Sequence, residues 1–188
     1  MTHDTATPGA GGDTGSRTKD TPRIYAACLA AYNNGHLHGR WIDATQDPDA
    51  IQAKISAMLA ASPVPDAEEW AIHDYEGYEG ARLEEYSGIE KAHALALFIV
   101  ERSEFGAKLL EHFGGDLDEA EAAFENYAGQ HADLAAFAEH LTEETGPPIP
   151  DSIAPYVDYR AMGRDLELGG DIFTVQLGFD ELHVFWSR

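Results

Sequence analysis

Carboxylates are the side chains of this sequence whose pattern points to a chemical role. No lysine or arginine occurs between Lys108 and Arg160, whereas twelve Asp or Glu lie in the same interval. Like charges one helical turn apart repel each other and cost about a few tenths of a kcal/mol per pair. A foldable segment that keeps such a pattern accepts this cost, and the usual reason is a function for a field of a single sign.

The same charge bias extends over the whole chain. The 188 residues hold 34 acids and 12 bases, a formal net charge of −22 with a pI near 4.5. Residues 22–83 carry nine acids and four bases, residues 84–127 carry eleven and three, and residues 128–188 carry eleven and three. The charge is thus spread along the body as along a rod. Such a chain repels nucleic acid and anionic membranes, and its natural partners are basic surfaces, above all those of proteins that bind DNA or RNA.

Adjacent acids suggest a second kind of chemistry, catalysis by paired carboxylates. The pairs are Glu68 with Glu69, Glu84 with Glu85, and Glu143 with Glu144. Neighbouring residues on one helix do not face each other, and no nucleophile or cleft is marked beside any pair. We therefore expect a solvated surface at these positions and no enzyme.

Histidine, cysteine and glycine offer weaker candidates. His36 and His38 place two imidazoles on one face of an expected strand, but no Cys cluster or His-Glu-x-x-His motif accompanies them, so we expect no metal site. Cys28 lies in an apolar segment and predicts an inert core thiol, which fits a reducing cytoplasm. The glycine pairs at 114–115 and 169–170 lack the strand–GxGxxG–helix context of a nucleotide site and indicate caps and turns. No cofactor is expected.

Residues 22–83 predict a small antiparallel sheet with one helix. The apolar runs 23–32 and 36–43 flank an Asn-Asn-Gly turn and predict two strands. Asp47 and Pro48 supply an N-cap and a first helical residue for the helix that follows. Residues 69–75 alternate in the manner of a third strand. The expected apolar stripe of the helix is Ile51, Ile55, Met58 and Leu59.

Residues 84–127 predict a bundle of helices. The segment 88–102 is almost continuously apolar, which indicates a helix buried on most sides. Ser103 can cap a second helix, and Asp116 begins a third. On this third helix Asp118, Glu121 and Glu125 recur about once per turn as a line of carboxylates. The residues expected to face inward on the last two helices are Phe105, Leu109, Phe113, Leu117, Ala120, Phe124 and Tyr127.

Residues 128–188 predict two further helices and a second sheet. The helices are expected at 133–144 and near 152–162, and the strands at 171–177 and 182–186. The inward residues of the first helix are Leu134, Phe137 and Leu141, and its outward acids are Glu139 and Glu143. Arg160 and Arg164 are expected to form local ion pairs with Asp158 and Asp165.

Together these segments predict an elongated α+β protein. Its expected parts are an N-terminal α+β domain at 22–83, a central helical domain at 84–127 and a C-terminal α+β domain at 128–188. Residues 1–21, rich in Thr, Gly and Asp, predict a disordered tail without the apolar core of a signal peptide. No stretch approaches the ~18 apolar residues that a membrane span needs.

Three blocks of the sequence resemble the ArdA family of antirestriction proteins. They are AACLAAYNNGHLHGRWID (26–43), EEWAIHDYEG (68–77) and YVDYRAMGRDLELGGDIF (156–173), the last being the most specific. The likeness covers about residues 22–188. It implies a non-enzymatic, cytoplasmic mimic of bent B-form DNA, curved and elongated, with three domains and a homodimer joined through its C-terminal part. Such a protein occupies the DNA-binding groove of type I restriction–modification enzymes, so that a mobile genetic element escapes restriction.

Taken with the charge pattern, the resemblance predicts a distributed partner-binding surface. Two alternatives stay open: an acidic interaction module for another basic partner, such as a nucleoid protein or transcriptional regulator, and a small hydrolase with paired carboxylates. The acids predicted to stand in for phosphates are Asp66, Glu68, Glu69, Asp74, Glu76, Glu84, Glu85, Glu111, Asp116, Asp118, Glu119, Glu121, Glu125, Asp133, Glu139, Glu143 and Glu144.

Overall fold

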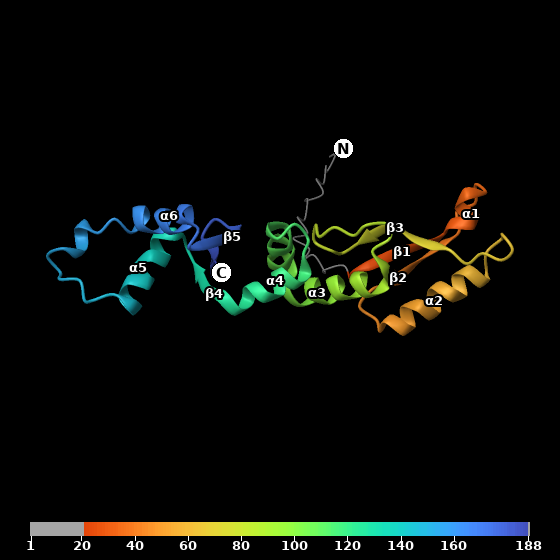
Figure 1. The fold of residues 1–188 in the computed structure, drawn as a ribbon, viewed down its shortest axis with the longest axis horizontal. Coiled ribbons are helices and arrows are strands. Elements are labelled where there is room, and N and C mark those ends of the chain that lie inside the picture. The colour runs from red at the N-terminus through yellow and green to blue at the C-terminus, as the bar shows by residue number, and fades with distance from the viewer. Residues whose placement is uncertain (1–20, 188) are drawn as a thin grey trace, which may run out of the picture.

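The described body of the protein is elongated and of mixed α+β class, as predicted. A computed structural model describes residues 21–187, so the tail predicted at 1–21 lies outside the described residues except for its last residue. One small sheet and a helix form one end, helices occupy the middle, and helices with a second small sheet form the other end (Figure 1). The predicted order of sheet, helices, then helices with sheet is confirmed.

The N-terminal sheet has three antiparallel strands in the order β2-β1-β3. The strands are β1 (Arg23–Cys28), β2 (Gly39–Asp43) and β3 (Trp70–Glu76). The central strand β1 is the most buried, and β3 forms an edge.

The helix α2 (Pro48–Ala60) follows this sheet's second strand and begins where the sequence predicts. The Asp47 carboxylate accepts a hydrogen bond from the Asp49 backbone N–H at 2.9 Å, which satisfies one of the unpaired donors at the helix start. The predicted stripe is confirmed, because Ile51, Ile55 and Met58 are buried and Leu59 packs against the same core.

The first predicted strand is wrong in its second half. The chain leaves β1 at Cys28 and forms a short helix, α1 (Leu29–Asn33), whose first turn the Cys28 Sγ caps by accepting from the Ala31 N–H at 3.4 Å. The second strand starts at Gly39 instead of His36. The Cys28 thiol satisfies a backbone N–H at the helix start, as a capping side chain does. The chain therefore turns into a helix at this point instead of continuing as a strand. Cys28 itself is fully buried, as expected of a core thiol.

The middle of the molecule contains α3 (Gly88–His112) and α4 (Leu117–Ala123). Helix α3 is interrupted at Ser103, whose φ of 60° and ψ of −144° are not helical, so the predicted boundary between two helices is present as a sharp kink. Positive φ angles at both residues of the 114–115 glycine pair end α3, as predicted.

The third central helix is shorter than predicted. Helix α4 ends at Ala123, a 3₁₀ turn η1 (Phe124–Asn126) follows, and a strand that the sequence did not predict, β4 (Tyr127–His131), comes next. Strand β4 pairs with β6, far away in sequence, and its residues carry no alternating pattern. Tertiary pairing therefore decides its conformation. Tyr127 lies on this strand instead of a helix; it is 38% exposed, and its ring packs against the buried Phe185 with centroids 5.1 Å apart.

The C-terminal part consists of α5 (Leu134–Thr145), the 3₁₀ turn η2 (Ala154–Tyr156), α6 (Tyr159–Gly169), β5 (Ile172–Gly178) and β6 (Glu181–Trp186). The strands form an antiparallel sheet in the order β4-β6-β5.

The second helix of this part was predicted too early. It begins at Tyr159 because Asp158 caps it, accepting from the Ala161 N–H at 2.9 Å, and because Pro155 holds the preceding residues in η2. It continues to Gly169, where Gly170 adopts the left-handed conformation with φ of 78°.

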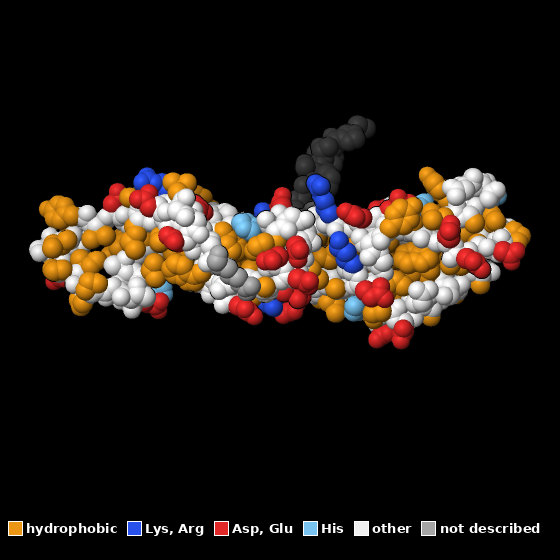
Figure 2. Space-filling model, viewed as in Figure 1, with side chains coloured by type: hydrophobic (Ala, Val, Ile, Leu, Met, Phe, Trp, Pro, Cys, Tyr) orange, Lys and Arg blue, Asp and Glu red, His pale blue; other side chains and the backbone are white. Residues whose placement is uncertain are grey.

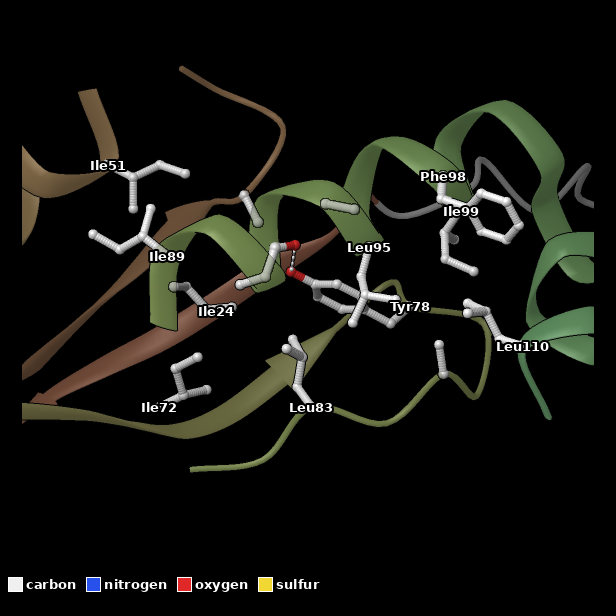
Figure 3. Close-up of a cluster of buried hydrophobic side chains, with 14 of the residues drawn as sticks. Ile24, Ile51, Ile72, Tyr78, Leu83, Ile89, Leu95, Phe98, Ile99 and Leu110 are labelled. Atoms are coloured by element: carbon white, nitrogen blue, oxygen red, sulfur yellow. Dashed lines mark hydrogen bonds between the residues drawn. The ribbon is translucent and has the colours of Figure 1, made fainter. Parts of the chain in front are cut away.

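The body is held together by one extended apolar core and a small second cluster. Figure 3 shows the larger core around Tyr78, where Ile24, Leu95 and Leu110 converge and the Tyr78 hydroxyl donates to the Ala92 carbonyl at 3.0 Å. The second cluster lies between α5 and the C-terminal sheet; its members are Phe137, Ile172, Leu182 and Val184.

Two contacts fix the C-terminal sheet and helices in place. Phe105 of α3 stacks on His183 of β6 with ring centroids 4.1 Å apart, so the central helices and the second sheet are in direct contact. Helices α5 and α6 pack so closely at Gly163 that a Cβ there would lie 2.3 Å from the Leu134 carbonyl oxygen. The exposed acids of the C-terminal part are therefore carried by helices and strands that pack tightly against one another.

Candidate functional site: an exposed carboxylate surface

Every acid of the predicted surface is exposed. The other described acids are exposed as well, apart from Asp43, Glu167 and Glu181, which are half-buried. On the face drawn in Figure 2, Asp and Glu side chains recur along the body, most densely over its middle, where a group of Lys and Arg also lies. The carboxylates of the described residues thus form a surface spread over the body.

The first group of acids lies on and beside the edge strand β3. Asp66, Glu68 and Glu69 belong to the loop that leads into it. Asp74 and Glu76 lie on the strand. Glu84 and Glu85 follow in a segment that runs alongside β3, since the Ile72 N–H donates to the Glu85 carbonyl at 3.0 Å. All of these acids are exposed, and Glu76 is paired with Arg23 of the neighbouring strand.

The second group surrounds the short helix α4. Glu111 lies in the last turn of α3, and Asp116 caps α4 by accepting from the Glu119 N–H at 3.1 Å. Asp118 and Glu119 lie in the first turn of α4, where the helix dipole favours negative charge and offsets part of their repulsion. The position of these acids at a helix start gives a physical reason why the sequence tolerates so many.

The predicted line of carboxylates along the third central helix is only partly formed. Asp118 and Glu121 lie on α4, but Glu125 belongs to η1 because the helix ends at Ala123. The error follows from the missed strand β4, which turns the chain out of the helix.

The third group lies on α5. Asp133 caps this helix by accepting from the Ala136 N–H at 2.8 Å. Glu139 and Glu143 are exposed one turn apart, as predicted. Glu144 lies 3.6 Å from the His140 imidazole. The groups together place carboxylates over the sheet end, the middle and the helical far end of the molecule.

Within residues 21–187, arginine pairs with only a few acids. Arginines pair with carboxylates at Arg23–Glu76, with Nε 2.8 Å from the carboxylate, at Arg102–Glu101 and at Arg164–Asp165. The last pair confirms one of the two expected near α6. The other expected pair is wrong for the described chain, because the Asp158 carboxylate caps α6 instead of meeting Arg160. The net field of the surface therefore remains negative.

The prediction also left out acids that are equally exposed. Like the acids of the predicted surface, they lie in polar segments of the sequence. A prediction from residue type alone would therefore have included them. They are Asp47, Asp49, Glu79, Glu90, Glu101, Glu104, Asp151, Asp158, Asp165, Asp171 and Asp180.

The histidines and the cavities are the other features of the described chain that could mark a site. His36 is exposed, whereas a ring nitrogen of His38 lies 2.7 Å from the Met58 carbonyl oxygen. No group of three or more His, Cys, Asp or Glu within residues 21–187 is placed to hold a metal ion. A cavity of about 540 Å³ lies beside the part of α3 that follows Ser103, and its wall includes Arg82, Glu104, Lys108 and Glu111, the last an acid of the predicted surface.

These features define a class, namely an elongated, acidic α+β protein whose carboxylates are spread over its exterior. The chain belongs to the ArdA family: the model of that family, described as antirestriction protein (ArdA), matches residues 24–181. The resemblance found in the sequence is thereby confirmed over most of the chain. Membership implies antirestriction activity and interaction with restriction–modification enzymes, and the family is one of inhibitors, not of enzymes.

Two further findings complete the comparison. A search among curated proteins gave no match. Within the described residues, no helix is both long enough and apolar enough to cross a membrane.

Proposed function

We propose that the protein is a DNA mimic that inhibits type I restriction–modification enzymes by occupying their DNA-binding groove. The observation that carries this proposal is the exposure of all the predicted acids along an elongated body in which few bases neutralise them. The proposed site is this whole surface, with no catalytic residue, metal or cofactor. The proposed place of action is the cytoplasm, where such an enzyme meets entering DNA.

The charge of the chain is of the right size for this task. Duplex DNA carries one negative charge per ~1.7 Å of axis, so a net charge of −22 corresponds to roughly eleven base pairs. A homodimer joined through the C-terminal part, which family membership suggests, would double this length. Carboxylates spaced by one helical turn, ~5.4 Å, can offer a comparable density to a groove that contacts a single face.

A distributed surface of this kind binds through many weak contacts. Each exposed carboxylate is screened within ~8–10 Å at working salt and contributes at most about 1 kcal/mol. The complex should therefore gain its strength from the number of contacts and from counterions released by the basic groove, as a DNA complex does.

A competition titration tests the proposal. Purified protein is added to the specificity and methylation core of a type I enzyme that holds a labelled duplex, and release of the duplex is followed by fluorescence anisotropy. The proposal predicts full displacement at low salt. A duplex that stays bound at saturating protein would refute it, and binding only to another basic DNA-binding protein or regulator would support the interaction-module alternative.

A further inference from the structure

Five side chains at the N-terminal end form a surface that differs from the rest of the acidic exterior. They are Tyr32, His73, Tyr86, Glu69 and Glu85, here called the aromatic–acid patch. Tyr32 is 54% exposed and Tyr86 is 73% exposed, although tyrosine rings carry large apolar area that usually packs inside. Exposed rings occur elsewhere as well, at Tyr156 and Phe179, so the mark of this patch is that its rings are grouped with exposed carboxylates.

The members of the patch are neighbours through their side chains. Tyr32 meets His73 edge-on, with ring centroids 4.8 Å apart. The same imidazole lies 3.9 Å from the Glu85 carboxylate, whose side chain is half exposed. Glu85 in turn raises the pKa of the Tyr86 hydroxyl by its charge and by a hydrogen bond, and Glu69 adds a smaller effect of the same sign. An exposed carboxylate therefore lies beside the imidazole that contacts the Tyr32 ring, and the second exposed ring, Tyr86, follows that glutamate directly in the chain.

Backbone hydrogen bonds hold the three segments of the patch in register. The Leu29 N–H, at the start of the helix that carries Tyr32, donates to the Glu69 carbonyl at 3.0 Å. The Ile72 N–H, next to His73, donates to the Glu85 carbonyl at 3.0 Å. The patch is thus pre-organised, and binding would cost little further ordering of the backbone.

We propose that the aromatic–acid patch binds an arginine side chain of the partner enzyme, a step that rests on the proposed function. A guanidinium can lie flat on a tyrosine ring while its N–H groups donate to a neighbouring carboxylate, which matches the exposed tyrosine rings grouped with the Glu85 carboxylate. Lysine lacks the planar, stacking fork, so the patch discriminates between the two cations. Among otherwise diffuse contacts it would act as an anchor, since aromatic residues paired with arginine dominate many interfaces.

A direct test needs no restriction enzyme. The full chain is titrated with an arginine homopeptide and with a lysine homopeptide of equal length, and the two dissociation constants are compared. We expect tighter binding of the arginine peptide, by about tenfold, and loss of this preference in Tyr32→Ala/Tyr86→Ala. The Tyr32→Phe/Tyr86→Phe variant keeps the rings and should keep the preference. An equal preference in the alanine variant, or none in the parent, would overturn the proposal.

The second arm uses the displacement assay and separates this proposal from the proposed function. Tyr32→Ala/Tyr86→Ala should need about tenfold more protein to release the duplex, whereas Leu97→Ala, which truncates an exposed apolar side chain on α3, should match the parent. Thermal unfolding confirms that the variants remain folded. Unchanged displacement by the alanine variant would overturn the anchor and leave the mimic standing; failure of the parent itself to displace DNA would overturn the mimic and its enzyme anchor.

Discussion

Replacing Tyr78 by phenylalanine removes one hydroxyl from the centre of the larger core and leaves the ring in place. The side chain is 2% exposed, and its hydroxyl donates to the Ala92 carbonyl at 3.0 Å (Figure 3). Loss of one such buried hydrogen bond lowers the free energy of unfolding by about 1 kcal/mol. At neutral pH, Tyr78→Phe should therefore be less stable than the parent by roughly this amount.

At high pH the order of the two proteins should reverse. Burial, with a smaller contribution from the Asp43 charge, raises the pKa of Tyr78 above its ordinary value near 10. Above that value the unfolded chain has lost the phenol proton while the folded protein still holds it, so the unfolded state binds fewer protons and stability falls as pH rises. The slope approaches about 1.4 kcal/mol per pH unit for one group. The phenylalanine variant lacks this loss, and the two stabilities should cross near pH ~11.

Urea unfolding of both proteins at a series of pH values from neutral to alkaline measures this difference. Lysines and the other tyrosines titrate in both proteins, so their contributions cancel when the variant is compared with the parent. A deficit of the variant that stays constant across the series would show that the Tyr78 hydroxyl titrates as freely in the folded core as in the unfolded chain. That result would refute our reasoning about the core.

Two further substitutions test the frame beneath the carboxylate surface. Gly163→Ala should lower the free energy of unfolding by about 1–3 kcal/mol in chemical denaturation, because the new Cβ would overlap the Leu134 backbone. Gly169→Ala is the control and should be tolerated, because its Cβ would make only an ordinary contact at 3.5 Å. Equal effects of the two substitutions would contradict the close packing of α5 on α6. Ser103→Gly should raise the midpoint of thermal unfolding, because a φ of 60° with ψ of −144° strains a residue that carries a Cβ by about 1 kcal/mol or more. Ser103→Ala keeps the Cβ and should bring no such gain. A midpoint that falls with glycine would show that the kink is unstrained.

Local signals explain which parts of the fold the sequence could predict. The starts of α2, α4 and α5 were found because an Asp N-cap is a contact within a few residues, at Asp47, Asp116 and Asp133. Strand β4 was missed because pairing with β6, and no pattern of its own, makes it a strand. The boundaries proposed at 83/84 and 127/128 remain predictions.

The candidate site likewise has a part that the sequence could predict and a part that it could not. That acids would be exposed follows from the cost of burying a charge, so residue type alone predicted the surface. The aromatic–acid patch could not be predicted, because α1, the start of β3 and the segment around Glu85 are separate in sequence and meet only through the pairing of β1 with β3 and the backbone bond of Ile72.

The most direct test of the mimic is the affinity for the enzyme core across a salt series. It compares the parent, the single variant Glu121→Gln, and one variant in which five acids become amides. The five acids are Asp118, Glu121, Glu125, Glu139 and Glu143.

Mimicry predicts that the single change costs at most about 1 kcal/mol of binding. The fivefold change should weaken binding far more and flatten its dependence on salt, because fewer counterions are released. Loss of all binding from Glu121→Gln alone, or an affinity that salt does not change, would contradict the account.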